Sequence, residues 1–197
     1  AIHACDALMA LAQNLANSAE TLAAAETNPF RQAELRDSAA ILHQVPAHPA
    51  RNFKEACQSF YLFQLALQLD NGSYAVNPEG ADKALLPYFQ RDIANGALTE
   101  PQAYEIVECL WFKLAQLSEV RATCAIDGYP MFDALLHGAS LEQAGINALS
   151  EMFLCAQQNL SALKLPVRLF RTVQHVSAAP FAACADTPVM EGLTPRL

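Results

Sequence analysis

The feature that most constrains this chain is a helical spacing of apolar residues that recurs through most of residues 1–157. Its clearest instance is the segment 53–69, FKEACQSFYLFQLALQL, which is nearly uncharged. Four of its large apolar side chains fall on one face: Phe53, Phe60, Phe63 and Leu67. Asn52 directly precedes this segment and is a residue type that caps helices. The segment is therefore predicted to be a long helix with an apolar face.

The same spacing predicts further helices at about 2–26, 30–43, 82–94, the segment behind Thr99, and a segment starting at Ser140 or just beyond Gly145. Thr99 and Gln102 have the spacing of a capping box, and Asn95–Gly96 ends the helix before it. Residues 163–172 alternate in hydropathy, but Pro166 limits this strand to an edge or an irregular strand. The sequence predicts a mainly α fold with a few short strands.

Composition narrows the functions that the chain can have. The 197 residues suit one domain or at most two small ones, and 53% of them are hydrophobic against 16% charged. So little charge predicts that some apolar surface meets another surface, through self-association or another protein chain. A net charge of −8 argues against binding nucleic acid. The longest apolar runs are too short for a membrane span, and the residues around Asp6 lack the basic region of a secretory signal.

The six cysteines are spread along the chain with no CxxC pair, which argues against a metal site. Cys57, Cys109 and Cys155 fall in apolar helical patterns, so we expect buried thiols in a reducing cytoplasm. His43 and His48 flank a proline-rich connector without a third ligand, and we expect them to be exposed loop residues.

Few residues have spacings that suggest chemistry. Glu105 and Glu108 lie three apart on one helical face, a spacing that a solvated helix surface explains. Arg168 and Arg171 point to opposite faces of the predicted strand, and Arg171 shares its face with apolar residues. Either this guanidinium is buried and needs an anionic partner, or it reaches solvent at the strand end. No common nucleotide-binding, metalloprotease or serine-hydrolase motif is present.

The order of several short motifs resembles the glycyl radical enzymes of the pyruvate formate-lyase type, in the branch that contains dehydratases and C–N or C–S lyases. Matching motifs are a proline pair, Phe-x-Glu-Ala-x-Gln, Asn-Gly, Asp before Pro-Tyr, Asp-x-x-x-Gly and Leu-Trp-x-Lys-Leu. They are represented here by Pro46, Pro49, Phe53, Glu55, Ala56, Gln58, Asn71, Gly72, Asp82, Pro87, Tyr88, Asp92, Gly96, Leu110, Trp111, Lys113 and Leu114. The segments DGYPMFDALLHGAS, GINALSEMFLC and LPVRLFR look like the family's Gly-Gly loop, Asn-Glu-Leu-Ser helix and Val-Arg strand.

The sequence also departs from the family pattern. Gly80 and Ala81 stand in place of a Gly-Arg pair, Lys83 replaces a Gln, and residues 150–153 read as a drifted Asn-Glu-Leu-Ser element. Neither the family's thiyl cysteine motif, Gly-Cys-x-Glu, nor its glycyl radical motif, Arg-x-x-Gly-Tyr, occurs.

The resemblance implies a single pyruvate formate-lyase-like domain over residues 1–197, truncated before the cysteine and glycyl radical loops. It implies the helical wall and first strands of the family's ten-stranded α/β barrel. The function expected from it is a truncated or degenerate homologue that is not catalytic alone, or alternatively a non-catalytic helical scaffold or interaction protein. We expect no catalytic residues, metal or cofactor. If contact with a small polar molecule survives, Asp82 and Arg171 are the expected residues; otherwise they pair with other side chains.

Overall fold

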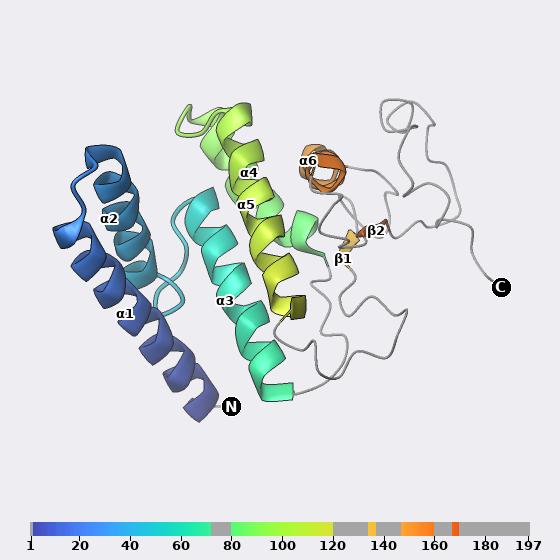
Figure 1. Ribbon diagram of the computed structural model, residues 1–197. Helices are drawn as coiled ribbons and strands as arrows, with labels where there is room; N and C mark the ends of the chain where they lie inside the picture. Colours follow the sequence, from blue (N-terminus) through green and yellow to red (C-terminus); the bar gives the residue numbers. More distant parts are fainter. Residues whose placement is uncertain (1, 72–79, 120–133, 137–146, 160–166, 170–197) are drawn as a thin grey trace, which may run out of the picture. The chain divides into compact units, whose positions relative to one another are not determined.

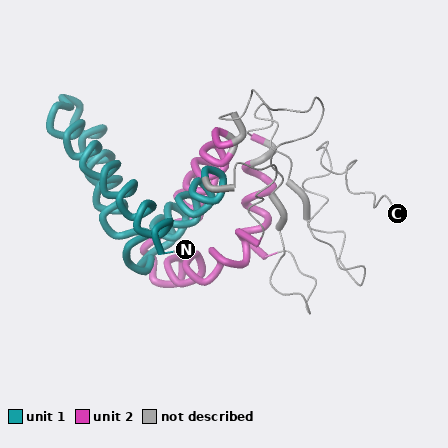
Figure 2. Tube along the Cα trace, turned by 90° about the horizontal axis from the view of Figure 1, so that it is seen from below, with its two compact units in different colours: residues 1–70 teal, residues 71–197 magenta. Residues whose placement is uncertain are grey.

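The computed structural model describes residues 2–71, 80–119, 134–136, 147–159 and 167–169. Within these residues the chain forms six helices and two three-residue strands (Figure 1). The prediction of a helix-rich fold is confirmed. The chain divides into two compact units, residues 1–70 and 71–197 (Figure 2). The single domain expected over 1–197 stays a prediction.

The first unit begins with a helical hairpin. Helices α1 (Ile2–Ala25) and α2 (Pro29–Gln44) run side by side (Figure 1). Asn28 separates them because its side chain accepts a hydrogen bond from the N–H of Phe30 at 3.0 Å. Pro29 then occupies the first helical turn, where no intrahelical N–H is needed. These two residues fix where the second helix starts.

Small residues let the helices of the first unit approach closely. The buried side chains of α1 are Leu8 and four alanines, Ala12, Ala16, Ala19 and Ala23. Leu8 and Ala12 form a core cluster with Leu62 of α3 (Phe53–Asn71). Alanine favours helix and has no side-chain rotamers to restrict, so an alanine-lined face suits close packing.

The apolar face expected on α3 is only partly buried. Phe53 is fully buried, whereas Phe63 and Leu67 are 53% and 47% exposed. Leu62, which lies off that face, is fully buried in the core of the first unit instead. Among the described residues, part of the predicted apolar face of α3 is therefore uncovered.

The second unit packs three helices and a short parallel strand pair. Helix α5 (Glu100–Glu119) contacts α6 (Ala148–Asn159), and α4 (Ala81–Ala94) contacts α6 and β1 (Ala134–Leu136). Strand β1 pairs with β2 (Val167–Leu169) in parallel, with Ala134 opposite Val167. β2 falls inside the predicted strand 163–172, whose other residues lie outside the described part. Sequence analysis did not anticipate β1.

Left-handed glycines begin and end the region around α4. Gly80 precedes the helix with φ 66°, and Gly96 follows it with φ 67°. Residues other than glycine rarely adopt this backbone conformation, so both positions favour glycine.

The capping box of α5 is formed by Thr99 and Gln102. The N–H of Thr99 donates to Gln102 Oε1 at 3.0 Å, and the N–H of Gln102 donates to Thr99 Oγ1 at 3.4 Å. The predicted capping box is confirmed.

Aromatic packing forms the core of the second unit. Trp111 of α5 and Phe153 of α6 are fully buried, and their ring centroids lie 4.9 Å apart with planes tilted by 52°. Such tilted pairs are favoured over face-to-face stacking by the charge distribution of the rings. Leu114 and Leu149 are also fully buried in this unit.

The cysteine predictions have a mixed outcome. Cys57 is buried as expected, and burial raises the pKa of its thiol. Cys155 is half-buried, but the expected burial of Cys109 is wrong because this residue is exposed. The buried positions of α5 include Val107, Leu110, Trp111 and Leu114, and Cys109 falls between them. Cys124 and Cys184 lie outside the described residues.

Candidate functional site

Asp82 lies in the first turn of α4 and is fully buried. Ser150 of α6, also fully buried, donates its hydroxyl to Asp82 Oδ2 at 2.6 Å. The position of Asp82 suits a carboxylate because the N-terminal end of a helix carries partial positive charge. A residue singled out from sequence therefore lies at the contact between α4 and α6.

Ser150 is held in place by two hydrogen bonds with Asn147. Asn147 precedes α6, and its Oδ1 accepts from the N–H of Ser150 at 2.9 Å. The N–H of Asn147 donates in return to Ser150 Oγ at 3.3 Å. Hydrogen bonds thus run from the Asn147 N–H to the Ser150 hydroxyl and on to the Asp82 carboxylate. The capping of α6 therefore orients the Ser150 hydroxyl, from which Asp82 accepts a hydrogen bond.

Sequence reasoning missed Ser150, which donates to Asp82, and Asn147, which holds Ser150. Asn147-Ala-Leu-Ser150 fits the Asn-Glu-Leu-Ser pattern with one change, at Ala148. Placing the drifted element at residues 150–153 was therefore a register error, since the capping pair is Asn147 with Ser150. An Asn followed three residues later by a Ser, just before an apolar run, was the signal available in the sequence.

Arg171 is the other expected ligand-binding residue, and it lies outside the described residues. Arg168 lies opposite Leu135 in the strand pair. The pairing of Asp82 and Arg171 at one site therefore stays a prediction. A hydrogen-bond partner of Asp82 in the described residues is the hydroxyl of Ser150.

A second buried carboxylate, Glu55, lies in the first turn of α3. Its Oε2 accepts from the backbone N–H of Arg51 at 2.6 Å, and its Oε1 accepts from Arg51 Nη2 at 2.6 Å. Asn52 caps the helix as predicted, because its Oδ1 accepts from the N–H of Glu55 at 2.8 Å. The Glu55 side chain is 3% exposed and the Arg51 side chain is 64% exposed. The ion pair therefore reaches from the interior to the surface.

Opposing effects set the pKa of Glu55. Burial is the largest single influence and raises the pKa, because it disfavours the charged form. The hydrogen bonds from Arg51, its positive charge and the hydrogen bond from Asn52 together outweigh burial. The pKa of Glu55 is consequently lower than its ordinary value, and the same contact raises the pKa of Arg51.

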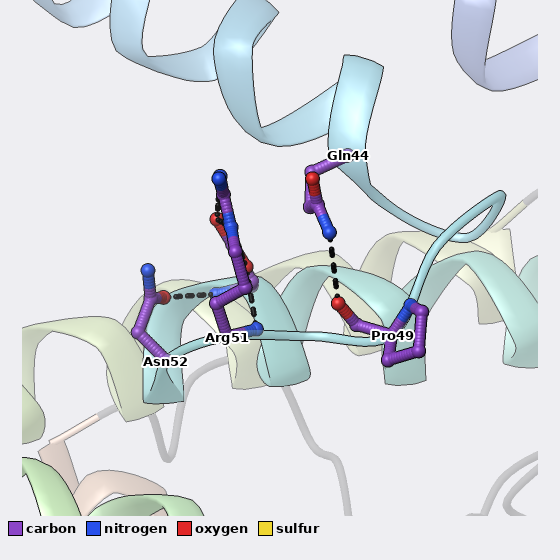
Figure 3. A network of polar contacts seen from close by, with 5 residues as sticks. Gln44, Pro49, Arg51 and Asn52 are labelled. Carbon is purple, nitrogen blue, oxygen red and sulfur yellow. Dashed lines mark hydrogen bonds and ion pairs between the residues drawn. The ribbon is translucent and has the colours of Figure 1, made fainter.

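The proline connector before α3 is held at two points (Figure 3). Gln44 Nε2 donates to the carbonyl of Pro49 at 2.9 Å, and the Arg51 N–H donates to Glu55. The Phe-x-Glu-Ala-x-Gln motif thus contains, in Glu55, the residue that ties the connector to α3. This role is structural, and nothing described around Glu55 suggests catalysis.

Of the paired carboxylates Glu105 and Glu108, Glu108 has structural partners. Glu108 accepts from Asn159 Nδ2 at 3.0 Å, and the same amide donates to Tyr104 Oη at 2.9 Å. Partial burial is the largest cause that raises the pKa of Tyr104, and the nearby Glu108 and Cys155 raise it further. Glu105 is exposed, as expected of a solvated face. The cluster joins α5 to α6.

His43 was expected in a loop, and this placement is wrong because it lies in the last turn of α2. Its Nε2 lies 2.9 Å from Glu20 Oε1, and its Nδ1 lies 3.1 Å from Gln13 Nε2. The ring therefore links the two helices of the hairpin.

Among the described residues, no group of three or more His, Cys, Asp or Glu side chains has the arrangement of a metal site. None of the described helices combines the length and apolar character that a membrane crossing requires.

These observations define a class of structure. It is a helical scaffold joined to a parallel strand pair, with Asp82, the carboxylate of a sequence motif, at the start of α4. The pyruvate formate lyase-like family model matches residues 1–194. The chain belongs to this family. Its relatives are glycyl radical enzymes, as the motif order had suggested.

Similar proteins are much longer than the present chain. The isethionate sulfite-lyase of Oleidesulfovibrio alaskensis is 35% identical over 153 residues, which cover 75% of this chain and 18% of the relative. The glycerol-bound B12-independent glycerol dehydratase from Clostridium butyricum has a TM-score of 0.72 and 29% identity, covering 84% of this chain and 21% of that structure. A glycyl radical enzyme from Archaeoglobus fulgidus has a TM-score of 0.67 and 26% identity, covering 83% and 22%. The chain spans about a fifth of the length of these relatives.

Proposed function

We propose that these residues form part of the helical scaffold of a glycyl radical enzyme homologue and carry out no radical reaction by themselves. The observation that carries the proposal is the family match over residues 1–194 together with the missing radical motifs of the sequence. A glycyl radical and a thiyl cysteine act as a relay, and each needs its own loop. In this proposal, these residues correspond to the helical wall and first strands of the family barrel. Radical chemistry would need residues equivalent to the remainder of a family-length chain.

Electron paramagnetic resonance tests this proposal. The 197-residue chain is incubated without oxygen together with a radical-activating enzyme and its reductant. We expect no stable doublet on this chain, whereas a full-length dehydratase treated in the same way develops one. A stable glycyl doublet on the 197-residue chain would overturn the proposal.

The alternative function is a non-catalytic helical interaction protein that self-associates. Phe63 and Leu67 of α3 favour it, because they lie one helical turn apart and are 53% and 47% exposed. Large apolar side chains gathered on one exposed face are typical of interaction sites. We propose a second copy of the chain as the partner of this face, in the cytoplasm of the cell.

Light scattering after size-exclusion chromatography tests self-association. The double variant Phe63→Ser, Leu67→Ser should elute as a smaller species than the unmodified chain. Phe112→Ser is the matched control, since Phe112 is 43% exposed but lies on α5. A monomeric unmodified chain at high concentration would rule out self-association through this face.

We also propose that Asp82 and Arg171 contact a small polar molecule. The support is that Asp82 matches the family's Asp before Pro-Tyr and that Arg171 matches its strand Arg. Isethionate and glycerol, which relatives act on or bind, are suitable probes. Arg171→Ala should abolish binding in equilibrium dialysis, while Arg168→Ala should retain it. Equal binding by both variants would contradict the proposal.

A further inference from the structure

Trp111 contains a buried hydrogen-bond donor that the function proposed above does not use. The residue is fully buried, and its Nε1 has no hydrogen-bond partner among the described residues. An indole N–H can only donate, so the group it needs is an acceptor. In folded proteins the large majority of buried polar atoms have such a partner.

The surroundings of the indole restrict which acceptor fits. The ring packs against Phe153, and Leu114 and Leu149 are fully buried in the same unit. An anion placed among such side chains would be strongly destabilised, because a buried charge loses its hydration. A neutral oxygen acceptor has no such charge to desolvate. Buried water is the common ligand of this kind, and it satisfies polar atoms that the chain itself leaves without partners.

A second donor in the same unit repeats the requirement. Asn147 Nδ2 is buried and has no hydrogen-bond partner among the described residues, although Asn147 Oδ1 accepts from Ser150. Both groups are N–H donors, and α6, which begins after Asn147, also carries the Phe153 ring that packs on Trp111. Among the described residues of the second unit, the two buried side-chain atoms without a hydrogen-bond partner are therefore both donors.

We propose that the indole N–H of Trp111 donates a hydrogen bond to a buried water molecule held where α5 packs on α6. This internal water is a ligand of the fold, and it is independent of any radical chemistry. The ring alone explains the packing against Phe153, and a phenylalanine would provide that packing without a donor. A buried water explains why the side chain at this position has an N–H donor.

The chain has a single tryptophan, so spectroscopy observes this site without interference. In the full chain labelled with 15N-tryptophan, the indole N–H should give one resonance that exchanges slowly with solvent. It should also show a dipolar cross-peak to a water proton. A slowly exchanging indole N–H with cross-peaks to protein protons alone would overturn the proposal.

An isosteric replacement provides the second measurement. In 3-benzothienylalanine at position 111, sulfur replaces the indole N–H while the shape of the ring is kept. Loss of a buried hydrogen bond should lower the ratio of folded to unfolded chain roughly tenfold. An unchanged or higher ratio would overturn the proposal, because it would mean that the N–H of the native residue makes no hydrogen bond.

Discussion

Glu55 and Asp82 are both buried carboxylates in the first turn of a helix, but they are stabilised in different ways. Glu55 is bonded by Arg51, four residues away, through both a guanidinium and a backbone N–H. Asp82 is bonded by the hydroxyl of Ser150, which lies 68 residues further along the chain. The first contact can form within a single helical turn. The second requires α4 and α6 to be packed together.

This difference separates local from tertiary stabilisation. The contact of Glu55 includes an Arg51 side chain that is 64% exposed, and water screens that part of the ion pair. Asp82 and Ser150 are both fully buried, so neither is solvated if the other is removed. Leaving a buried donor or acceptor without its partner is more destabilising than the mean value of a hydrogen bond. We therefore expect the contact between α4 and α6 to be the more sensitive to substitution.

The largest effect is expected for Asp82→Ala. It removes the acceptor of the Ser150 hydroxyl and leaves a void, which should lower the free energy of unfolding by about 3 kcal/mol. Urea denaturation followed by Trp111 fluorescence measures it, because Trp111 lies in the same unit as Asp82.

Two controls isolate the hydrogen bond of Asp82. Asp82→Asn keeps an oxygen acceptor of the same shape and should cost only about 1 kcal/mol. Ser150→Ala should cost less in the Asp82→Ala background than in the unmodified chain, because the contact is already lost. Equal losses for Asp82→Ala and Asp82→Asn would show that this hydrogen bond contributes little.

A smaller effect is expected for Glu55→Ala. It leaves the Arg51 N–H without its acceptor, and we expect a loss of about 2 kcal/mol, since the guanidinium remains solvated. The loss of far-UV circular dichroism in urea measures it. Glu55→Gln keeps an acceptor but not the charge, so it should lie between Glu55→Ala and the unmodified chain. A greater loss for Glu55→Ala than for Asp82→Ala would reverse the comparison.

The pH dependence of stability offers a further test of Glu55. Its pKa is lowered on folding, so the unfolded chain binds a proton more readily than the folded chain does. The stability that Glu55 contributes is therefore present above about pH 4.5, its ordinary value, and is lost as the pH falls through the lower folded value. The difference in stability between the unmodified chain and Glu55→Gln should shrink on acidification below pH 4.5. A difference that is constant with pH would contradict this assignment.

Local signals explain why sequence reasoning found the helices and several of their ends. Asn52, Thr99 with Gln102, and Gly96 act within a few residues of their own position, and the structure confirms each of them. The start of α2 is likewise set by a neighbouring residue, Asn28. Such contacts can be predicted because their partners are adjacent in the sequence.

Tertiary contacts explain the failures. Spacing grouped Phe63 and Leu67 with Phe53, but spacing alone does not say which side of α3 the other helices cover. The same limit applies to Cys109, which falls between the buried positions of α5. The motif order pointed to Asp82 as a site residue, but its partner Ser150 depends on how α4 meets α6.

The smallest effect is expected at the exposed capping box of α5, which calibrates the two buried carboxylates. Thr99→Ala removes a side-chain acceptor that water can replace, so we expect a loss of about 1 kcal/mol or less. Trp111 fluorescence in urea again reports on it, since Trp111 lies on the helix that the box caps. Thr99→Ser keeps the hydroxyl and should retain the stability of the unmodified chain. If Thr99→Ala cost as much as Asp82→Ala, burial would not be the reason for the greater sensitivity of Asp82, and the distinction between local and tertiary stabilisation would fail.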